Sequence, residues 1–415
     1  MTASPATQAP TVVPPPANVF LVLLPITLVV FGGFLNIGVP LPVLSLHVHN
    51  TLGMSTLVVG AVIGAHYAAA LLTRAWAGGQ SDIHGPKRAV VTGGLSAMLS
   101  GVAYLASLAF RDAPAISVAV LVVGRLLAGC GESLIVTGAL SWGVMLVGPR
   151  NAGKVMVWVG IAMYGAYAVG APAGMAIYGR TGFIGIAVAA ILLPLLVLGL
   201  VAFVRPVAPL AARRVPFYKV LSTVWVPGLG LAFCSSGFGA INAFIALLFA
   251  ARNWGSASLA FTAFGLAFIV ARLLFGHLPD KIGGAKVALA SVAVEVVGQL
   301  LIWGAGGVWV AYLGAAFTGF GYSLAFPGFG VEAVRRAPPQ SRGVAMGAFV
   351  AFLDVSLGIT GPGAGAIAGA AGFGAVYLAG TVTVALSGMV AAYLLVNPPR
   401  EAAPPANVQP AGRSG

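Results

Sequence analysis

The chain is poor in charge and in cysteine. Only 7% of its 415 residues are charged, with 8 acidic against 21 basic side chains. A soluble domain has about 25% charged residues, because its surface must be hydrated. The composition therefore excludes a soluble enzyme. The two cysteines, Cys130 and Cys234, both lie in apolar runs, so we expect reduced, buried thiols and no disulfide framework.

Three other patterns are missing. The net charge of +13 comes from basic residues that occur singly or in pairs. Nucleic-acid binding requires a clustered basic face, so we expect no nucleic-acid partner. No Gly-x-x-x-x-Gly-Lys-Ser/Thr motif occurs, so ATP is not the evident energy source, and no cofactor is expected. Residues 1–17 carry no charge and so lack the basic start of a signal peptide.

Apolar residues dominate what is present. The hydrophobic fraction is 59%, the mean hydropathy is +1.01, and there are 58 glycines. Glycine is frequent where transmembrane helices pack closely. A bilayer core of about 30 Å requires roughly 20 apolar residues in a helix. We expect twelve helical spans, at 18–46, 54–78, 87–110, 114–147, 151–179, 182–204, 221–250, 256–278, 284–304, 308–334, 340–370 and 372–396.

The basic residues in the loops orient these spans. On one side lie only Arg111, Arg180 and Arg252. The side of the termini holds fifteen: Lys87, Arg88, Arg150, Lys154, Arg205, Arg213, Arg214, Lys219, Lys281, Lys286, Arg335, Arg336, Arg342, Arg400 and Arg413. Because cytoplasmic loops are rich in Lys and Arg, we expect both termini in the cytoplasm and the chain in a bacterial inner membrane.

The spans divide into two groups of six. Residues 205–220 carry four basic residues and several prolines, and are predicted to be the cytoplasmic linker between bundles at 18–204 and 221–396. The Pro- and Ala-rich ends, 1–17 and 397–415, are predicted to be disordered cytoplasmic tails. The expected fold is an all-α polytopic membrane protein made of two pseudo-symmetric six-helix bundles.

The two halves repeat one another. At an offset of 198 residues, Arg74, Gly78, Asp82, Gly85 and Arg88 recur as Arg272, Gly276, Asp280, Gly283 and Lys286. At an offset of 190, Gly124, Gly129, Gly131, Ser133 and Pro172 recur as Gly314, Gly319, Gly321, Ser323 and Pro362. Parallel six-helix repeats characterise one large transporter class, whose solute site lies between the halves near mid-membrane.

At these motifs the sequence resembles the major facilitator superfamily, over nearly its whole length. Residues 78–88 are similar to the family's signature loop between helices 2 and 3, and residues 276–283 to its degenerate copy between helices 8 and 9. Residues 121–131, which include Arg125, are similar to the helix 4 signature. Residues 36–42, 131–133 and 352–362 resemble the YhhS-type, arabinose-efflux-permease-like branch. The resemblance implies alternating access by rocking of the two halves.

The signature loops also have a physical interpretation. Asp82 and Asp280 are carboxylates at the cytoplasmic rim, able to accept N–H groups at a helix N-terminus of the opposite half. We predict a conformational latch made of these two residues with Gly78, Gly85, Lys87, Arg88, Gly276, Lys281, Gly283 and Lys286. Gly78 and Gly276 are expected to leave room for closely crossing helix ends. The alternative is a loop that only satisfies the positive-inside rule.

Charged residues within spans are functional candidates, since each costs about 2.5–3.5 kcal/mol on insertion scales. Arg125 and Glu132 lie seven residues apart on one helix face. They suit solute contact or proton coupling, or else a mutually compensating structural pair. Asp354 lies on a stripe of small residues, where an apolar setting favours its protonated form. That state suits either a proton carrier or a buried hydrogen-bonding group.

Other polar groups complete the candidates. His66 is a candidate because an unperturbed histidine titrates near neutral pH, although a lone membrane histidine is more often an interhelical hydrogen bonder. Asn36 and Asn242 are expected to line the cavity. Glu295 lies on a helix that is peripheral in the family, so structural pairing is expected ahead of a cavity role. His47 and His49 have no third ligand nearby in the sequence, so no metal site is expected.

These features predict a monomeric secondary transporter in the lipid bilayer. Its expected activity is proton-coupled efflux, by antiport, of a small organic solute such as a sugar or a drug-like compound. A proton symporter or facilitated importer of a small metabolite is the alternative. A transporter-like receptor is more remote, because the longest loop has about 16 residues. A membrane enzyme would need converging catalytic groups, which the short loops lack.

Overall fold

The computed structural model describes residues 19–148, 151–207, 217–337 and 342–398, which contain helices and no strand. The helices are α1 (Val19–Gly38), α2 (Leu41–Leu46), η1 (His47–Thr51), α3 (Thr56–His84), α4 (Pro86–Ser107), η2 (Leu108–Phe110), α5 (Pro114–Val147), α6 (Ala152–Phe203), α7 (Phe217–Ala251), α8 (Ser258–Phe275), α9 (Leu278–Ile282), α10 (Gly284–Trp303), α11 (Val308–Arg336) and α12 (Arg342–Val396). The N-terminal tail, nearly all of the C-terminal tail, most of the linker, and Arg150, Arg213, Arg214, Arg400 and Arg413 lie outside the described residues.

Ten helical stretches in the described residues are long and apolar enough to cross a membrane. The two within α6 and α12 have 52 residues each, about 78 Å at 1.5 Å per residue. Each contains one non-helical glycine, Gly182 (φ 64°) or Gly372 (φ 82°). These breaks fall at the predicted span boundaries. If α6 and α12 each cross the membrane twice, the ten stretches make twelve crossings. The count of twelve remains a prediction.

The repeat extends to the backbone at these turns. Gly182 and Gly372 are separated by the 190-residue offset, and Gly85 and Gly283, which precede α4 and α10, by the 198-residue offset. All four have positive φ, a conformation that strains residues with a Cβ atom. The glycines of the signature loops are therefore needed to turn the chain between helices.

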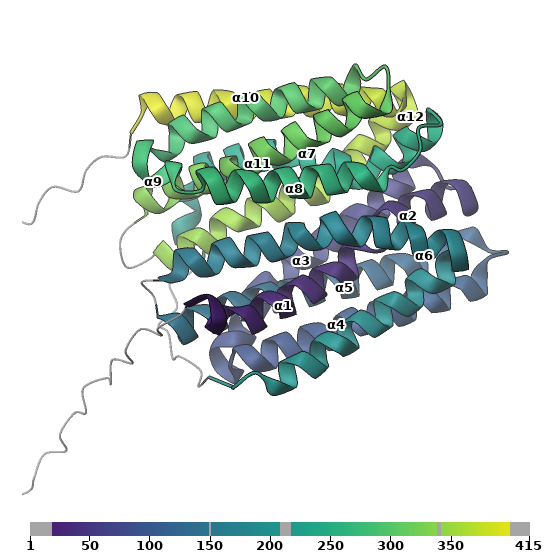
Figure 1. Cartoon of the computed structure of the whole chain (residues 1–415), viewed down its shortest axis with the longest axis horizontal. Helices are drawn as coiled ribbons and strands as arrows, with labels where there is room; N and C mark the ends of the chain where they lie inside the picture. The colour runs from purple at the N-terminus through teal and green to yellow at the C-terminus, as the bar shows by residue number, and fades with distance from the viewer. Residues whose placement is uncertain (1–18, 149–150, 208–216, 338–341, 399–415) are drawn as a thin grey trace, which may run out of the picture.

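Figure 1 shows the helices side by side in two groups, α1–α6 (purple to teal) and α7–α12 (teal-green to yellow). In the first group α1 packs on α6, and α5 packs on both α3 and α4. In the second group α7 packs on α12, and α11 packs on both α8 and α10. The structure thus confirms an all-helical fold of two bundles.

Glycines in both bundles allow the same close helix contacts. A Cβ atom at Gly129 would overlap the carbonyl oxygen of His66, and one at Gly319 would overlap that of Phe264. Two further pairs of contacts correspond in the same way. The contact of Gly131 with Gly93 corresponds to that of Gly321 with Ser291. The contact of Gly124 with Ser100 corresponds to that of Gly314 with Gly298. The repeat seen in the sequence is therefore a repeat of helix packing.

The bundles meet along two seams, one between α3 and α12 and one between α6 and α8. We name the end of the molecule where α1 begins and α12 ends the terminus side, and the opposite end the far side. At the far side the Thr56 hydroxyl donates to the Gly365 carbonyl at 2.7 Å. In the other seam the Thr262 hydroxyl donates to the Ala168 carbonyl at 2.7 Å. Both seams are therefore closed toward the far side.

The outer surface of the bundles is apolar. Leu72, Leu196 and Trp309 expose 79%, 70% and 79% of their area, which suits contact with lipid. Both cysteines are free thiols. Cys234 is buried as predicted, but Cys130 is only half-buried, because it lies at the edge of a small cluster centred on Leu134.

Candidate functional site

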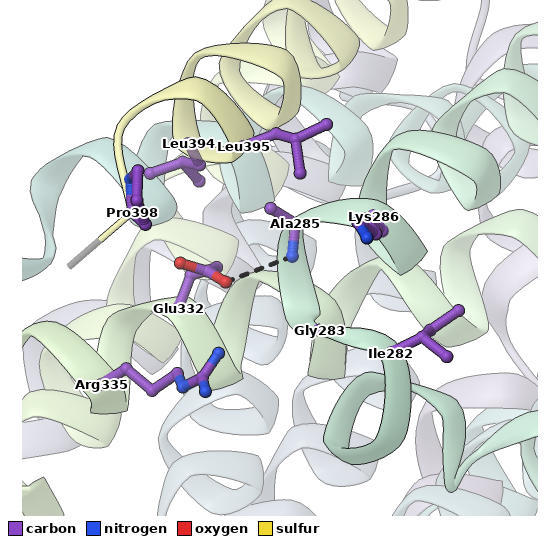
Figure 2. A pocket seen from close by; sticks show the side chains of 9 residues that line it. All are labelled: Ile282, Gly283, Ala285, Lys286, Glu332, Arg335, Leu394, Leu395 and Pro398. Carbon is purple, nitrogen blue, oxygen red and sulfur yellow. Dashed lines mark hydrogen bonds between the residues drawn. The ribbon is translucent and has the colours of Figure 1, made fainter.

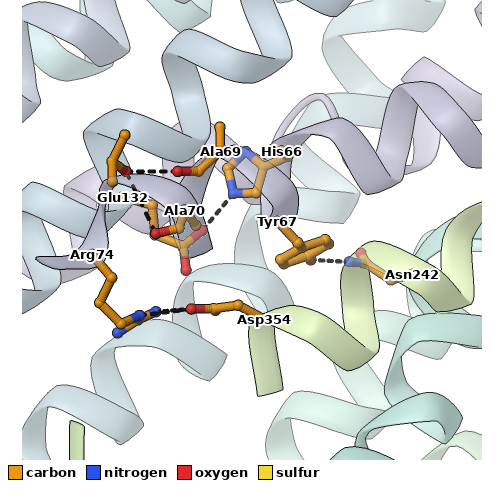
Figure 3. A network of polar contacts seen from close by, with 9 residues as sticks. His66, Tyr67, Ala69, Ala70, Arg74, Glu132, Asn242 and Asp354 are labelled. Atoms are coloured by element: carbon orange, nitrogen blue, oxygen red, sulfur yellow. Dashed lines mark hydrogen bonds and ion pairs between the residues drawn. The ribbon is translucent and has the colours of Figure 1, made fainter. Parts of the chain in front are cut away.

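Polar side chains from both bundles meet in the α3–α12 seam. They are His66, Tyr67 and Arg74 of α3, Glu132 of α5, Asn242 of α7 and Asp354 of α12 (Figure 3). His66 and Arg74 are eight residues apart, so α3 presents them on one face. We name these residues, together with Arg125, the ionic site.

Arg74 and Asp354 form an ion pair between the two bundles. The Nε and Nη2 atoms of Arg74 both lie 2.6 Å from Oδ2 of Asp354. The side chains are 19% and 3% exposed, so the pair is largely shielded from solvent. Among the described residues, no hydrogen bond or ion pair joins the bundles nearer the terminus side. The polar contacts between the halves thus extend from the far side to this pair and end there.

Glu132 pairs with His66 within the first bundle. Its Oε2 atom contacts Nε2 of the fully buried His66 ring. The contact follows from the close approach of α3 to α5 at Gly129. The alternative of a mutually compensating Arg125–Glu132 pair is therefore wrong, since the ionic partner of Glu132 is on the neighbouring helix. Which ring nitrogen of His66 carries the proton is set by this contact.

Arg125 is fully buried, and none of its three guanidinium nitrogens has a hydrogen-bond partner among the described residues. Its charge interacts electrostatically with His66, Tyr67 and Tyr167. A buried cation without an acceptor is unfavourable. By the usual rule for ionisable groups at membrane depth, Arg125 is a functional candidate.

The two asparagines differ in their contacts. Asn242 donates from Nδ2 to the Tyr67 hydroxyl, a buried hydrogen bond between the bundles. Asn36 is buried on α1, and its Oδ1 atom has no partner among the described residues. Asn242 thus lies between the halves, whereas no hydrogen bond among the described residues links Asn36 to the ionic site. That the two asparagines line a solute cavity stays a prediction.

A buried aromatic cluster fills the other seam. Its members are Tyr164, Tyr167, Phe238, Phe264, Phe268 and Tyr322, from α6, α7, α8 and α11. The rings of Tyr164 and Phe268 stack with centroids 3.8 Å apart. The Arg272 guanidinium lies over the Phe268 ring, 5.2 Å from its centroid, and its Nε atom has no partner in the described part of the chain. We name the cluster and Arg272 the aromatic site.

Glu295 lies apart from both sites, inside the second bundle. It is fully buried against Gly237 of α7 and Gly321 of α11. Neither carboxyl oxygen has a hydrogen-bond partner among the described residues. The predicted structural pairing of Glu295 is therefore wrong. Gln299, which lies one turn further along α10, donates to the Gly237 carbonyl at 3.3 Å and to the Thr318 hydroxyl at 3.1 Å and makes no hydrogen bond with Glu295.

The predicted latch makes few contacts. Asp82 is half-buried and Asp280 exposed, and neither has a hydrogen bond or ion pair with a described side chain. Lys87 donates to the carbonyls of Ala202 and Val204, at 3.1 and 2.8 Å. A Cβ atom at Gly78 would meet nothing within 4 Å, so no helix crosses closely there. The latch stays a prediction. Residues 338–341, which precede the N-terminus of α12 in the opposite bundle from Asp82, lie outside the described residues.

Glu332 makes the helix N-terminus contact expected of the latch aspartates, but within one bundle. It accepts a hydrogen bond from the Ala285 backbone N–H at 3.2 Å, in the first turn of α10 (Figure 2). It also pairs with Arg336. A cavity of about 140 Å³ lies beside it, lined in part by Lys286 and Arg335. A negative charge at this position stabilises α10 through the helix dipole.

The far-side histidines have ordinary packing roles. His47 stacks on Phe183 with ring centroids 4.0 Å apart, and Nδ1 of His49 lies 2.8 Å from the Met54 carbonyl oxygen. In the part of the chain that the structure describes, no group of three side chains is arranged to bind a metal ion.

Sequence reasoning did not select Tyr67, Arg74, Arg272 or the aromatic cluster as site residues. The repeat was the available signal for the two arginines, because they are equivalent at the 198-residue offset. The repeat also relates Tyr164, Phe264 and Tyr322 to Asp354, His66 and Glu132, whereas Tyr67 and the other three rings had no such signal.

Comparison with known proteins identifies the family. The model of the Major Facilitator Superfamily matches residues 26–255 and 227–414. The chain is 42% identical over 371 residues to the MFS-type transporter STM4428 of Salmonella typhimurium (strain LT2), covering 89% of this chain and 95% of that protein. It is 46% identical over 378 residues to an MFS-type transporter of Burkholderia mallei (strain SAVP1), covering 90% and 92%.

Two solved transporter structures share the fold. The human organic anion transporter MFSD10 (TETRAN) superposes with a TM-score of 0.66 at 15% identity, covering 91% of this chain and all of that chain. The nucleoside transporter NupG superposes with a TM-score of 0.70 at 14% identity, covering 90% and 99%. At such identities the likeness shows the fold alone. Fold, repeats and relatives agree that the chain is a membrane transporter of the major facilitator superfamily.

Proposed function

We propose that this transporter couples the movement of a small organic solute to protons, by alternating access between the two bundles. The Arg74–Asp354 pair carries the proposal, because it is the contact between the halves whose strength depends directly on protonation. A proton on Asp354 removes the negative charge and leaves Arg74 unpaired. Breaking a buried ion pair in this way costs about 3–5 kcal/mol, enough to shift a balance between two conformations.

The second carboxyl lies in the other bundle. Glu132 contacts His66, and its charge also acts on Tyr67 and Tyr167. A proton taken up by the His66–Glu132 pair adds one positive charge beside Arg125, and its release removes that charge. Protons and solute then compete or cooperate through the charges that lie between the two bundles, which is how a gradient drives transport.

The direction of transport is the finer part of the proposal. The sequence resemblance favours efflux by antiport. The asymmetry of basic residues in the loops favours cytoplasmic termini in a bacterial inner membrane, and we propose that the chain acts as a monomer. The charges favour proton symport as a second candidate. Arg74, Arg125 and Arg272 are opposed by only two carboxyls in the seams, so each proton bound there adds to a positive surplus that attracts an anion.

The test is proton flux evoked by solutes in inverted vesicles that contain the transporter and a pH-sensitive dye. A transported solute is expected to cause a pH change in the wild type and none in Asp354→Asn, which keeps the size of the side chain. Asp112→Asn, at an exposed far-side position, is the matched control. Solute uptake with no proton flux in the wild type, or equal flux in Asp354→Asn, contradicts the proposal.

A further inference from the structure

The ionic and aromatic sites are repeat-related counterparts. At the offsets that relate the two halves, four of the ionic-site residues correspond to aromatic-site residues. Arg74 corresponds to Arg272, His66 to Phe264, Glu132 to Tyr322, and Asp354 to Tyr164. The packing follows the same relation, because Gly129 contacts His66 as Gly319 contacts Phe264. At three of these positions the α3–α12 seam therefore has His or a carboxyl where the α6–α8 seam has an aromatic ring, and the arginine is kept in both.

The two sites differ in their charge balance. The ionic site has two guanidinium groups, Arg74 and Arg125, and two carboxyls, Glu132 and Asp354. The aromatic site keeps the arginine but has no carboxylate, since Tyr164 takes the position of Asp354. The Arg272 charge is thus left without a counterion among the described residues, and its Nε atom is an unused buried donor.

We propose that the aromatic site binds the transported solute, and that this solute is an organic anion with a flat ring. The anionic group would pair with Arg272, as Asp354 pairs with Arg74 in the other seam. The ring would insert among Tyr164, Phe268 and Tyr322, whose faces already take part in stacking. This inference rests on the proposed function only in taking the protein to be a transporter of small solutes.

Physical chemistry selects this class over the alternatives. A guanidinium binds a carboxylate or phosphate through parallel charge-assisted hydrogen bonds. A neutral solute would bury Arg272 without a counterion, and a cation would add repulsion. A ring gains from stacking beyond the area that it buries. The six rings are all buried, so the solute reaches them only when one seam opens.

The test is calorimetric titration of the purified full-length transporter with four probes at one pH. Benzoate, benzamide and benzylamine share a ring and differ in charge, and acetate carries the charge without the ring. Benzoate is expected to bind at least tenfold more tightly than each of the others. Equal binding of benzamide, tighter binding of benzylamine, or no binding of benzoate would overturn the inference.

Variants assign the binding to Arg272. Arg272→Gln is expected to weaken benzoate binding at least tenfold. Arg252→Gln is the matched control, because Arg252 also lies over a ring, that of Trp254, but at the far-side surface, and there no change is expected. Tyr164→Asp supplies the missing carboxylate and is expected to abolish benzoate binding. Unchanged benzoate binding by Arg272→Gln would show that the anion binds elsewhere.

The inference and the proposed function fail separately. Benzoate binding that depends on Arg272, without proton flux in vesicles, supports the aromatic site and contradicts proton coupling. Proton flux with another solute, alongside no benzoate binding, contradicts the aromatic site and leaves proton coupling supported.

Discussion

Tyr164 holds in the first bundle the repeat position that Asp354 holds in the second, and each interacts with an arginine of the opposite bundle. Asp354 forms an ion pair with Arg74, whereas Tyr164 leaves the Arg272 charge without a carboxylate. Gene duplication produces two equivalent seams, and this substitution makes them chemically different. We propose that one seam serves protons and the other a solute anion.

We expect the glycine contacts at the far side to control closure of the α3–α12 seam. A Cβ atom at Gly361 would overlap the Gly60 carbonyl oxygen, whereas one at Gly363 would meet nothing within 4 Å. Gly361→Ala is expected to disfavour closure of the α3–α12 seam, and Gly363→Ala to leave it unchanged. Labelling of a Thr56→Cys reporter by an impermeant maleimide should accelerate several-fold in Gly361→Ala alone. Equal labelling rates in the two variants would exclude this gate.

Glu295 is expected to matter for stability rather than for coupling. Because both of its buried oxygens lack partners among the described residues, replacing it by an apolar side chain of similar length removes an unfavourable group. Glu295→Met is expected to raise the free energy of unfolding by about 1–3 kcal/mol, measured by thermal unfolding in detergent. If Glu295→Met and Glu295→Gln both lose uphill transport, the carboxyl takes part in coupling after all.

The latch prediction is tested at Asp82. Asp82→Asn keeps the side-chain size and weakens an anion–dipole contact by about 0.3–1 kcal/mol, or up to ~2 kcal/mol if it is partly buried. The variant is expected to fold and to shift the balance toward opening at the terminus side. Accessibility of a terminus-side cysteine reports this shift, with Asp112→Asn as the control. Unchanged accessibility together with normal transport removes the latch role.

The sequence predicted the helical spans, the repeat and the family, because hydropathy and glycine spacing are local properties. It also selected Asp354 and Asn242 as candidates, and the structure finds both in contact with the opposite bundle. It did not identify the partners, since the rotation of each helix about its axis decides which charges meet. Glu132 therefore pairs with His66 on α3 rather than with Arg125 on its own helix.

The aromatic site illustrates the same limit. Its rings come from four helices and are separated by up to 158 residues in the chain, from Tyr164 to Tyr322. No local pattern brings such residues together, so only the packed structure could show them. The repeat offset was the one feature of the sequence that linked Arg272 to Arg74.

The most direct test of proton coupling through Asp354 is a spin-label distance between the bundles as a function of pH. Phe203 and Val396 are exposed by 88% and 78%, and end α6 and α12 at the terminus side. In a chain with Cys130 and Cys234 replaced by serine, cysteines at these two positions carry the labels. In the wild type we expect the distance between the labels to increase as pH falls, because protonation of Asp354 releases Arg74. In Asp354→Asn we expect the long distance, which the wild type shows at acid pH, at every pH. A wild-type distance that does not depend on pH, or an Asp354→Asn profile that follows the wild type, would contradict it.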